Sequence, residues 1–322
     1  MNKKFIVGLT LCLAQNNYAA IKKGSVYFYE PQQVVVAVID SGVDITHPML
    51  KNNIWTNQGE TGKDIFGNDK QINGVDDDGN GFVDDVHGWN FVDNNNKVDD
   101  GQGHGTHIAA IIKNEFMHKQ IENTKSTLPQ AIRLMILKYY DPKGKQQDNI
   151  KYSTSAIQYA NKMGAQIINY SGGGAESSAT ELAAIQNSEK KGILFIAAAG
   201  NDQSNTDLIK YYPASYGLTN MITVAAADHA GALSNFSNYG ARSVDIVAPG
   251  QGILSALPHQ GYGIMSGTSQ ATAFVTGAAA KILATQNAAL KPEQVLTKLL
   301  KTAIVNKSLQ GKTKNRLALL ND

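Results

Sequence analysis

Four polar residues, each in a separate and strongly patterned segment, could together cleave an amide bond. They are Asp40 at the end of VVVAVID, His104 in DGQGHGTHIA, Asn201 at the end of AAAGN, and Ser269 in SGTSQATAFVTG. Cleavage of an amide requires a nucleophile, a base that takes its proton, a carboxylate that orients the base, and a donor for the developing oxyanion. The four side chains supply one group for each task. The pattern therefore predicts acyl transfer through a covalent serine intermediate.

Each motif also has a structural interpretation when it is taken alone. An aspartate after a strand commonly caps a turn, and GTS is an ordinary turn sequence. His104 and His107 could form a metal-ligand pair, although their spacing of three is not that of the helical HExxH motif. We interpret His107 as a packed histidine rather than a second base.

Taken together, the four motifs resemble the subtilase family of serine proteases. The order Asp, His, Ser along the chain is that of subtilisin and differs from the orders of chymotrypsin and the α/β-hydrolases. Weaker matches between the motifs extend the resemblance from about residue 34 to about residue 303: LKYYD, INYSGGG, YYPASY, SNFSNYG and VDIVAPG. The resemblance implies a serine endopeptidase that acts on proteins or peptides and needs no organic cofactor.

The resemblance assigns a role to each of the four residues. Ser269 opens an Ala-rich helix, whose N-terminus favours an oxyanion, and would be the nucleophile. His104 would be the general base, and Asp40 would hold its ring in the correct tautomer. Asn201 would donate its side-chain amide to the oxyanion, next to the backbone N–H of Ser269.

The resemblance also locates the substrate cleft. The stretch Ser171, Gly172, Gly173 and Gly174 would pair with the substrate backbone as an added strand, while Ala198, Ala199 and Gly200 would line the pocket for the residue before the cleaved bond. Gly172 stands where the family often has a larger apolar residue, which predicts a wider cleft. Tyr211 is expected at the floor of the pocket. The alternative for the glycine run is a flexible loop.

The segment NGVDDDGNGFVDD resembles the start of a calcium-binding loop. Its candidate ligands are Asp76, Asp78, Asn80 and Asp84, with Gly81 at the tight turn. His87 replaces the bidentate glutamate at the twelfth position, so we do not expect an EF-hand. The family resemblance implies a structural Ca²⁺ loop, and the alternative is a solvated acidic turn. Met49 replaces an acidic residue that serves another family calcium site, which we therefore do not expect.

Short, unbroken apolar runs alternate with helix-like stretches along the chain. Unbroken runs indicate strands buried on both faces, as in a parallel sheet. The runs are 34–39, 134–137, 167–168, 193–199, 221–227 and 244–248, and the helical stretches are 104–114, 150–163, 178–191, 269–285 and 292–303. This alternation, with the resemblance, predicts a three-layer α/β subtilisin-like domain with a mostly parallel central sheet flanked by helices. Residues 57–103 are expected to form a long loop.

The N-terminus and the composition indicate an exported enzyme. A basic Met1–Lys4 precedes the apolar run Phe5–Leu13, so residues 1–20 are expected to be a signal peptide and 21–322 a single peptidase domain with its core at about 34–303. No run reaches the roughly 18 apolar residues of a membrane span. The net charge of +2 gives no reason to expect nucleic acid. We expect a secreted or periplasmic monomer.

Two functions of other classes remain open from the sequence. One is a non-catalytic, calcium-binding secreted module that keeps the fold as a recognition surface. The other is an acyl transferase that passes the acyl group to an amine instead of water. Reaction of Ser269 with a fluorophosphonate would discriminate the first, and product masses with added amine would discriminate the second.

Overall fold

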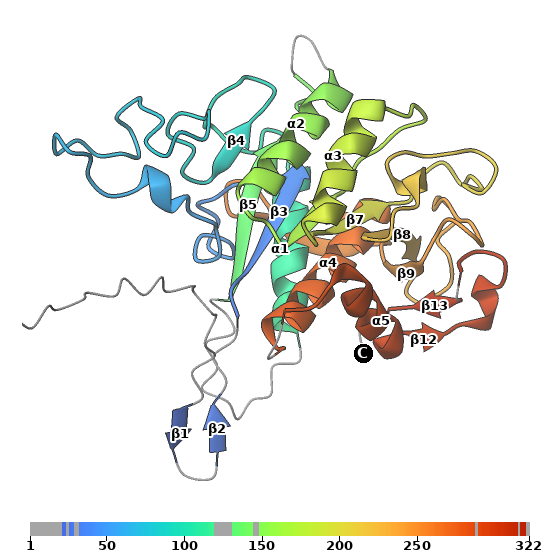
Figure 1. The fold of residues 1–322 in the computed structure, drawn as a ribbon. Coiled ribbons are helices and arrows are strands. Elements are labelled where there is room, and N and C mark those ends of the chain that lie inside the picture. Colours follow the sequence, from blue (N-terminus) through green and yellow to red (C-terminus); the bar gives the residue numbers. More distant parts are fainter. Residues whose placement is uncertain are drawn as a thin grey trace, which may run out of the picture. The chain divides into compact units, whose positions relative to one another are not determined.

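The structure, a computed structural model, describes residues 21–23, 26–28, 32–118, 131–143, 148–286, 289–314 and 316–319. The expected signal peptide lies outside the described residues. The chain divides into two compact units, residues 1–30 and 31–322. In the first unit, β1 (Ile21–Lys23) and β2 (Val26–Phe28) form an antiparallel hairpin. All other elements belong to the second unit (Figure 1).

A nine-stranded sheet forms the centre of the second unit, in the order β12-β13-β9-β8-β7-β6-β3-β5-β4. Seven adjacent strands, from β9 to β4, are parallel, and β13 continues them in the same direction, while β12 runs antiparallel to β13. The strands are β3 (Val34–Asp40), β4 (Gly88–Asn90), β5 (Ile132–Lys138), β6 (Ile167–Tyr170), β7 (Leu194–Ala198), β8 (Met221–Ala227), β9 (Ile246–Pro249), β12 (Ile304–Val305) and β13 (Leu317–Ala318). A separate hairpin pairs β10 (Ile253–Leu257) with β11 (Gly261–Met265).

Helices cover both faces of this sheet (Figure 1). Alternate side chains of a strand point to opposite faces, so Val36 and Val38 join one core cluster while Ala37 and Ile39 join the other. The first cluster packs against α1, α4 and α5, and the second against α2 and α3. The helices are α1 (His104–Met117), α2 (Asn149–Lys162), α3 (Ala179–Lys190), α4 (Thr268–Ala284) and α5 (Pro292–Thr302), with 3₁₀ turns η1 (Gln58–Glu60), η3 (Ala214–Tyr216) and η4 (Lys307–Leu309). The predicted three-layer α/β fold is confirmed.

Helices α1 and α4 lie in very close contact. A Cβ atom added to Gly277 of α4 would lie 2.5 Å from the carbonyl oxygen of Ile112 in α1. Two backbones can approach this closely only where one of them carries no side chain. Since α1 begins with His104 and α4 begins at Thr268, this contact fixes the relative position of the helices that carry the two candidate catalytic residues.

Candidate active site

Asp40 and His104 come together at the carboxyl edge of the sheet. Asp40 is the last residue of β3, and His104 is the first residue of α1. The Asp40 carboxylate is nearly fully buried, and its Oδ1 lies 2.7 Å from His104 Nδ1. The histidine side chain keeps 26% of its surface exposed, on the solvent side of this pair. A carboxylate bonded to Nδ1 leaves Nε2 as the ring nitrogen that can take a proton.

The surroundings of His104 change its basicity in two opposing ways. Burial lowers the pKa of His104, but the charge and hydrogen bond of Asp40, together with the charge of Asp100, raise it by more. The net pKa therefore lies above its ordinary value of 6.5. A stronger base at Nε2 is what a residue needs in order to take a proton from an alcohol.

Asp100, which was not among the predicted site residues, organises the loop that leads to His104. Its buried carboxylate accepts hydrogen bonds from the hydroxyl of Ser41, from the backbone N–H groups of Gln102 and Gly103, and from both the N–H and the hydroxyl of Thr106. These donors include the unpaired N–H groups at the start of α1. The sequence feature that could have indicated this role is an aspartate four residues before His104, in a glycine-rich stretch that favours turns.

Gly105 allows β3 and α1 to approach each other at this point. A Cβ atom at Gly105 would lie 2.0 Å from the carbonyl oxygen of Gly42 and 3.2 Å from the Cβ atom of Asp40. Gly42 itself has φ of +96°, a conformation that favours glycine. The glycines beside the two motifs therefore permit the short contact between Asp40 and His104.

Ser269 lies in the first turn of α4, at the same edge of the sheet. The Ser269 hydroxyl donates a 2.9 Å hydrogen bond to the carbonyl oxygen of Ser171, directly after β6. Strand β6 pairs with β3, so Ser171 and Asp40 lie at the carboxyl ends of neighbouring strands. The carboxyl ends of adjacent parallel strands are where active sites of such sheets gather.

Asn201 follows β7, the next strand of the sheet, and is oriented by the start of α4. Its Oδ1 accepts hydrogen bonds from the backbone N–H of Thr268 at 2.9 Å and from the Thr268 hydroxyl at 3.1 Å. Among the described residues, the Asn201 amide nitrogen has no hydrogen-bond partner, and the side chain is exposed. The amide is thus held by its oxygen with its N–H groups free to donate.

The two predicted substrate-binding stretches lie at the carboxyl ends of the neighbouring strands β6 and β7, and their backbone groups differ in whether they are free to pair with a substrate. Both backbone groups of Gly174 pair with Tyr212, at 2.9 and 2.7 Å, so they are not free for a substrate strand. Gly172 and Gly173 make no backbone hydrogen bond within the described part of the chain. Ala198, Ala199 and Gly200 are all buried, so these residues expose little surface to a substrate.

Two tyrosines occupy the space that the glycines leave open. A Cβ atom at Gly172 would lie 2.0 Å from the Tyr139 hydroxyl, so Tyr139 fills the space by which Gly172 was expected to widen the cleft. The Tyr211 ring lies against both glycine segments, because Cβ atoms added to Gly173 and Gly200 would come within 2.5 and 3.0 Å of it. Tyr211 thus contacts both of the predicted substrate-binding stretches.

His107 lies one turn after His104 and faces the β10–β11 hairpin. Its Nε2 lies 3.0 Å from the carbonyl oxygen of Ile253 and 3.2 Å from that of Gly263. Burial lowers the pKa of His107, and the side chain is fully buried. These contacts are those of a neutral, packed histidine that ties α1 to the hairpin.

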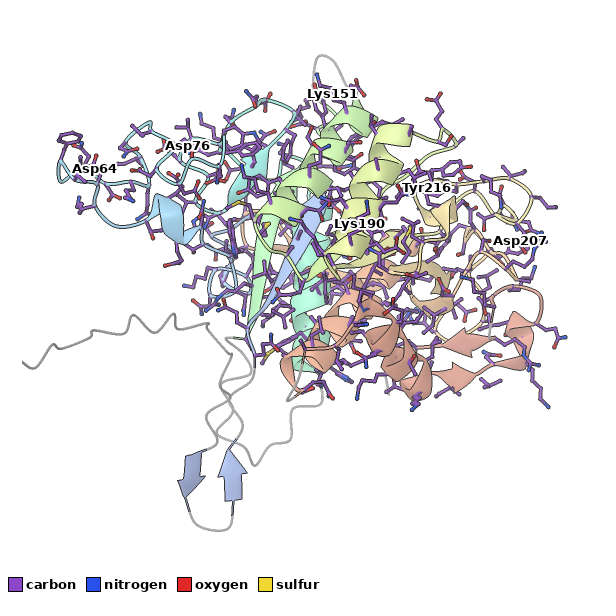
Figure 2. The ribbon with its side chains drawn as sticks, in the orientation of Figure 1. Asp64, Asp76, Lys151, Lys190, Asp207 and Tyr216 are labelled. Atoms are coloured by element: carbon purple, nitrogen blue, oxygen red, sulfur yellow. The ribbon has the colours of Figure 1, made fainter. Side chains whose placement is uncertain are left out.

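The four predicted calcium ligands lie in one loop, where Asp76 Oδ1 and Asp78 Oδ1 both accept from the backbone N–H of Asn80, each at 3.0 Å. Oxygens of Asp76 accept from the backbone N–H groups of Asn80 and Gly81, and those of Asp84 accept from Gly74. The Asn80 side-chain oxygen accepts from Phe82. Only Asp78 belongs to the group of carboxylates whose oxygens lie within 4.8 Å of one another. The loop, which includes Asp64 and Asp76, projects from one side of the domain (Figure 2).

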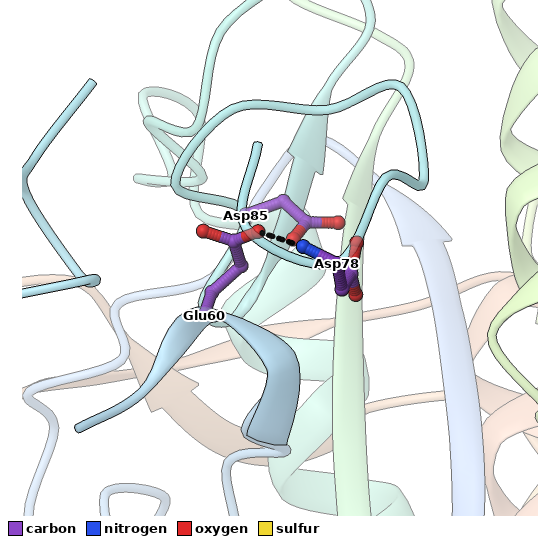
Figure 3. A group of neighbouring side chains, drawn as sticks. All are labelled: Glu60, Asp78 and Asp85. Atoms are coloured by element: carbon purple, nitrogen blue, oxygen red, sulfur yellow. Dashed lines mark hydrogen bonds between the residues drawn. The ribbon is translucent and has the colours of Figure 1, made fainter. Parts of the chain in front are cut away.

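That group consists of Glu60, Asp78 and Asp85, which face each other in Figure 3. Glu60 and Asp85 are fully buried, and burial is the main cause that raises the pKa of each. Glu60 Oε1 accepts from the backbone N–H of Asp77, whereas its buried Oε2 has no hydrogen-bond partner among the described residues. No lysine or arginine pairs with the three carboxylates in that part of the chain. Hard oxygen donors with uncompensated charge fit Ca²⁺.

Comparison with known proteins identifies the family. The sequence profile of the Subtilase family matches residues 31–319. The chain belongs to the subtilase family, whose members are serine proteases that hydrolyse peptide bonds.

Relatives within the family are identical to this chain at about a third of the aligned positions. The Thermophilic serine proteinase of Bacillus sp. (strain AK1) is 34% identical over 251 residues, 78% of this chain and 52% of that protein. Thermitase of Thermoactinomyces vulgaris is 33% identical over 251 residues, 78% of this chain and 75% of that protein. The Major intracellular serine protease of Bacillus subtilis (strain 168) is 31% identical over 257 residues, 78% of this chain and 68% of that protein. The chain thus spans about half of the first relative.

Solved structures agree with the fold. A cold adapted subtilisin-like serine proteinase superposes with a TM-score of 0.65 at 25% identity, covering 94% of both chains. A lanthipeptide protease superposes with a TM-score of 0.66 at 23% identity, covering 87% of this chain and 83% of the other. The second likeness concerns the fold alone.

Proposed function

We propose that this protein is a serine endopeptidase that hydrolyses proteins or peptides through an acyl-enzyme on Ser269. The observation that supports this most is the 2.7 Å contact between Asp40 Oδ1 and His104 Nδ1, at the sheet edge where Ser269 lies in the first turn of α4. Family membership supports the reaction class.

In the proposed mechanism, the Ser269 hydroxyl turns from the Ser171 carbonyl to Nε2 of His104. Ser269 Oγ then attacks the substrate carbonyl carbon while its proton passes to Nε2. The Asn201 amide and the Ser269 backbone N–H donate to the oxyanion that forms. When the C–N bond breaks, His104 returns the proton to the leaving amine. Water then attacks the acyl carbon and gives a proton to His104, which passes it to Ser269 Oγ as the ester bond breaks and the acid is released. Asp40 stabilises the imidazolium each time it forms.

Hydrolysis of an unstructured protein such as casein tests this proposal. The wild-type chain is expected to cleave it, and Ser269→Ala is expected to lose cleavage by about 10⁶-fold, which is the loss known for subtilisin. Cleavage that survives this substitution would exclude Ser269 as the nucleophile. In a second reaction with an added amine, products that carry an amide bond to that amine in place of a free carboxylic acid would assign the chain to acyl transfer.

We propose that Ca²⁺ serves as a structural ion in the acidic loop. The unpartnered Glu60 oxygen and the adjacent carboxylates of Asp78 and Asp85 support this site. When bound, the ion would supply the positive charge that three neighbouring carboxylates require. The donor set differs from the one expected from the sequence, with which it shares only Asp78.

We also propose that the enzyme is exported and works as a monomer in the secreted or periplasmic space. The basic and apolar pattern of Met1–Leu13 supports export. Within the described residues, no helix has the length and apolarity needed to cross a membrane. Relatives include both an intracellular and a cell wall-associated protease, so the relatives do not decide the location. The proposal of export therefore depends on the N-terminal pattern.

A further inference from the structure

A cavity of about 370 Å³ opens beside the glycine segment that follows Ser171. Helix α2 contributes its first residues, α3 contributes its first turn, and η3 begins just beyond Tyr212. The lining residues are Tyr139, Asn149, Ile150, Tyr170, Gly173, Gly174, Ala175, Glu176, Glu181 and Tyr212. The Ser171 carbonyl accepts from the Ser269 hydroxyl, so the cavity begins two residues along the chain from a direct contact of the proposed nucleophile.

Glu181 places a buried carboxylate in the wall of this cavity. The residue is only 4% exposed, and its oxygens have two hydroxyl partners, Ser153 Oγ at 3.3 Å and Tyr216 Oη at 3.1 Å. Figure 2 labels Tyr216 beside α3. Each hydroxyl has a single proton and also lies within hydrogen-bond distance of a backbone carbonyl, at 3.1 Å from Ile150 and 3.0 Å from Ser178. Neither hydroxyl therefore gives its proton to Glu181 alone.

No positive side chain compensates this carboxylate within the described residues. No lysine, arginine or histidine lines the cavity, and Glu181 forms no ion pair there. The start of α3 offers only the partial charge of a helix N-terminus. Burial raises the pKa of Glu181 accordingly. A buried carboxylate in this situation is costly unless a cation reaches it.

The other walls suit a cation with an apolar stem. Glu176 adds a second carboxylate, which is exposed, while Tyr139, Tyr170 and Tyr212 supply aromatic surface. Aromatic faces attract ammonium and guanidinium groups, and they also pack against methylene chains. An apolar side chain in the cavity would leave Glu181 desolvated and unpaired.

We propose that this cavity is a subsite for a lysine or arginine side chain of the substrate, with Glu181 as its counter-charge. The proposal rests on the proposed peptidase function, because the cavity borders the segment along which the substrate chain would lie.

Matched peptides test the subsite. Fluorogenic peptides would carry lysine or norleucine, and arginine or citrulline, at each of the five positions before the cleaved bond. At one position we expect the charged side chain to raise kcat/KM at least tenfold over its neutral counterpart. Equal values at every position would overturn the proposal without the need for any variant.

Glu181→Gln keeps the shape of the side chain and removes its charge. The variant should lose the preference for the charged peptide, because lysine or arginine no longer meets a counter-charge and the neutral side chain no longer covers an unpaired carboxylate. Glu189→Gln makes the same change on the same helix outside the cavity lining, and should retain the preference. A preference that persists in Glu181→Gln, with an unchanged melting temperature, would contradict the assignment.

Binding separates this proposal from the catalytic one. In the Ser269→Ala variant, fluorescence anisotropy of labelled lysine and norleucine peptides should show at least tenfold tighter binding of the lysine peptide. The ratio of the two binding affinities tests the subsite whether or not the wild-type chain cleaves peptides. Loss of cleavage with retained selective binding would overturn only the peptidase proposal, and equal binding would overturn the subsite.

Discussion

The Asp40–His104 contact determines how activity should depend on pH. A protonated His104 cannot accept the Ser269 proton, so kcat/KM should fall as the pH drops through the raised pKa of His104, above 6.5. Asp40→Asn removes the charge that raises this pKa, so the acidic limb should move to lower pH. The same change should lower kcat by about 10⁴-fold, because the ring adopts the wrong tautomer. Profiles of kcat/KM against pH for both proteins check this, and an unmoved limb would contradict it.

Tyr211 should restrict the residue before the cleaved bond to small side chains. Its ring lies against Gly173 and Gly200, where a larger substrate side chain would enter. We expect Tyr211→Ala to raise kcat/KM for phenylalanine relative to alanine at this position by at least tenfold, since each methylene accommodated is worth about 1–3 kcal/mol. Tyr262→Ala, an equal truncation of an exposed tyrosine on β11, should leave the ratio unchanged. Selectivity that is identical in all three proteins would show that Tyr211 does not limit the pocket.

Residues inside continuous motifs could be predicted from the sequence, whereas isolated residues could not. The motifs around Asp40 and His104 contain glycines that allow close approach, and the structure brings these two side chains together. Glu60 and Asp85 lie in a stretch with many acidic residues, and nothing in their spacing indicates that both are buried. In the sequence, nothing distinguishes Glu181 from other acidic residues in the first turn of a helix. Its burial depends on contacts with α2 and η3, which are distant in sequence.

Among the elements, the contact between α1 and α4 is the one on which the site depends most. Gly277→Ala should destabilise the fold by about 1–3 kcal/mol, because the added methyl would overlap the Ile112 carbonyl. The expected fall in melting temperature is about 2–4 °C for each kcal/mol, measured in the Ser269→Ala background to avoid self-digestion. Gly101→Ala is the control, since its added methyl would meet only the Asp141 carboxylate at 3.7 Å. Equal melting temperatures for the two variants would show that the contact between α1 and α4 can accommodate the added methyl group.

Unbroken apolar runs predicted the central strands because these strands are buried on both faces. The three-residue β4 was not predicted, since it lies within the Asp- and Gly-rich loop and exists through its pairing with β5. Strands β12 and β13 extend the sheet past the expected end of the core at residue 303, and each has only two residues. Such short strands carry no periodicity of their own and depend on the neighbouring strand.

For the whole molecule, we expect Ca²⁺ to increase stability. Ion at about 100 times its Kd should add about 2.7 kcal/mol to the free energy of unfolding. The gain should shrink as the pH falls through the raised pKa values of Glu60 and Asp85, because protons then compete for the carboxylates. Thermal melting of the Ser269→Ala protein with Ca²⁺ or EDTA measures this. Glu60→Gln should lose the response and Asp64→Asn should keep it, and a response that survives in Glu60→Gln would place the ion elsewhere.

Covalent labelling tests the catalytic account most directly. The intact mass of the wild-type chain after treatment with a fluorophosphonate should rise by one phosphonyl group, and peptide mapping should place that group on Ser269. Asp40→Asn and His104→Ala should label far more slowly, because the serine hydroxyl then lacks its activated base. A wild-type chain that stays unlabelled, or that carries the group on a residue other than Ser269, would contradict the account.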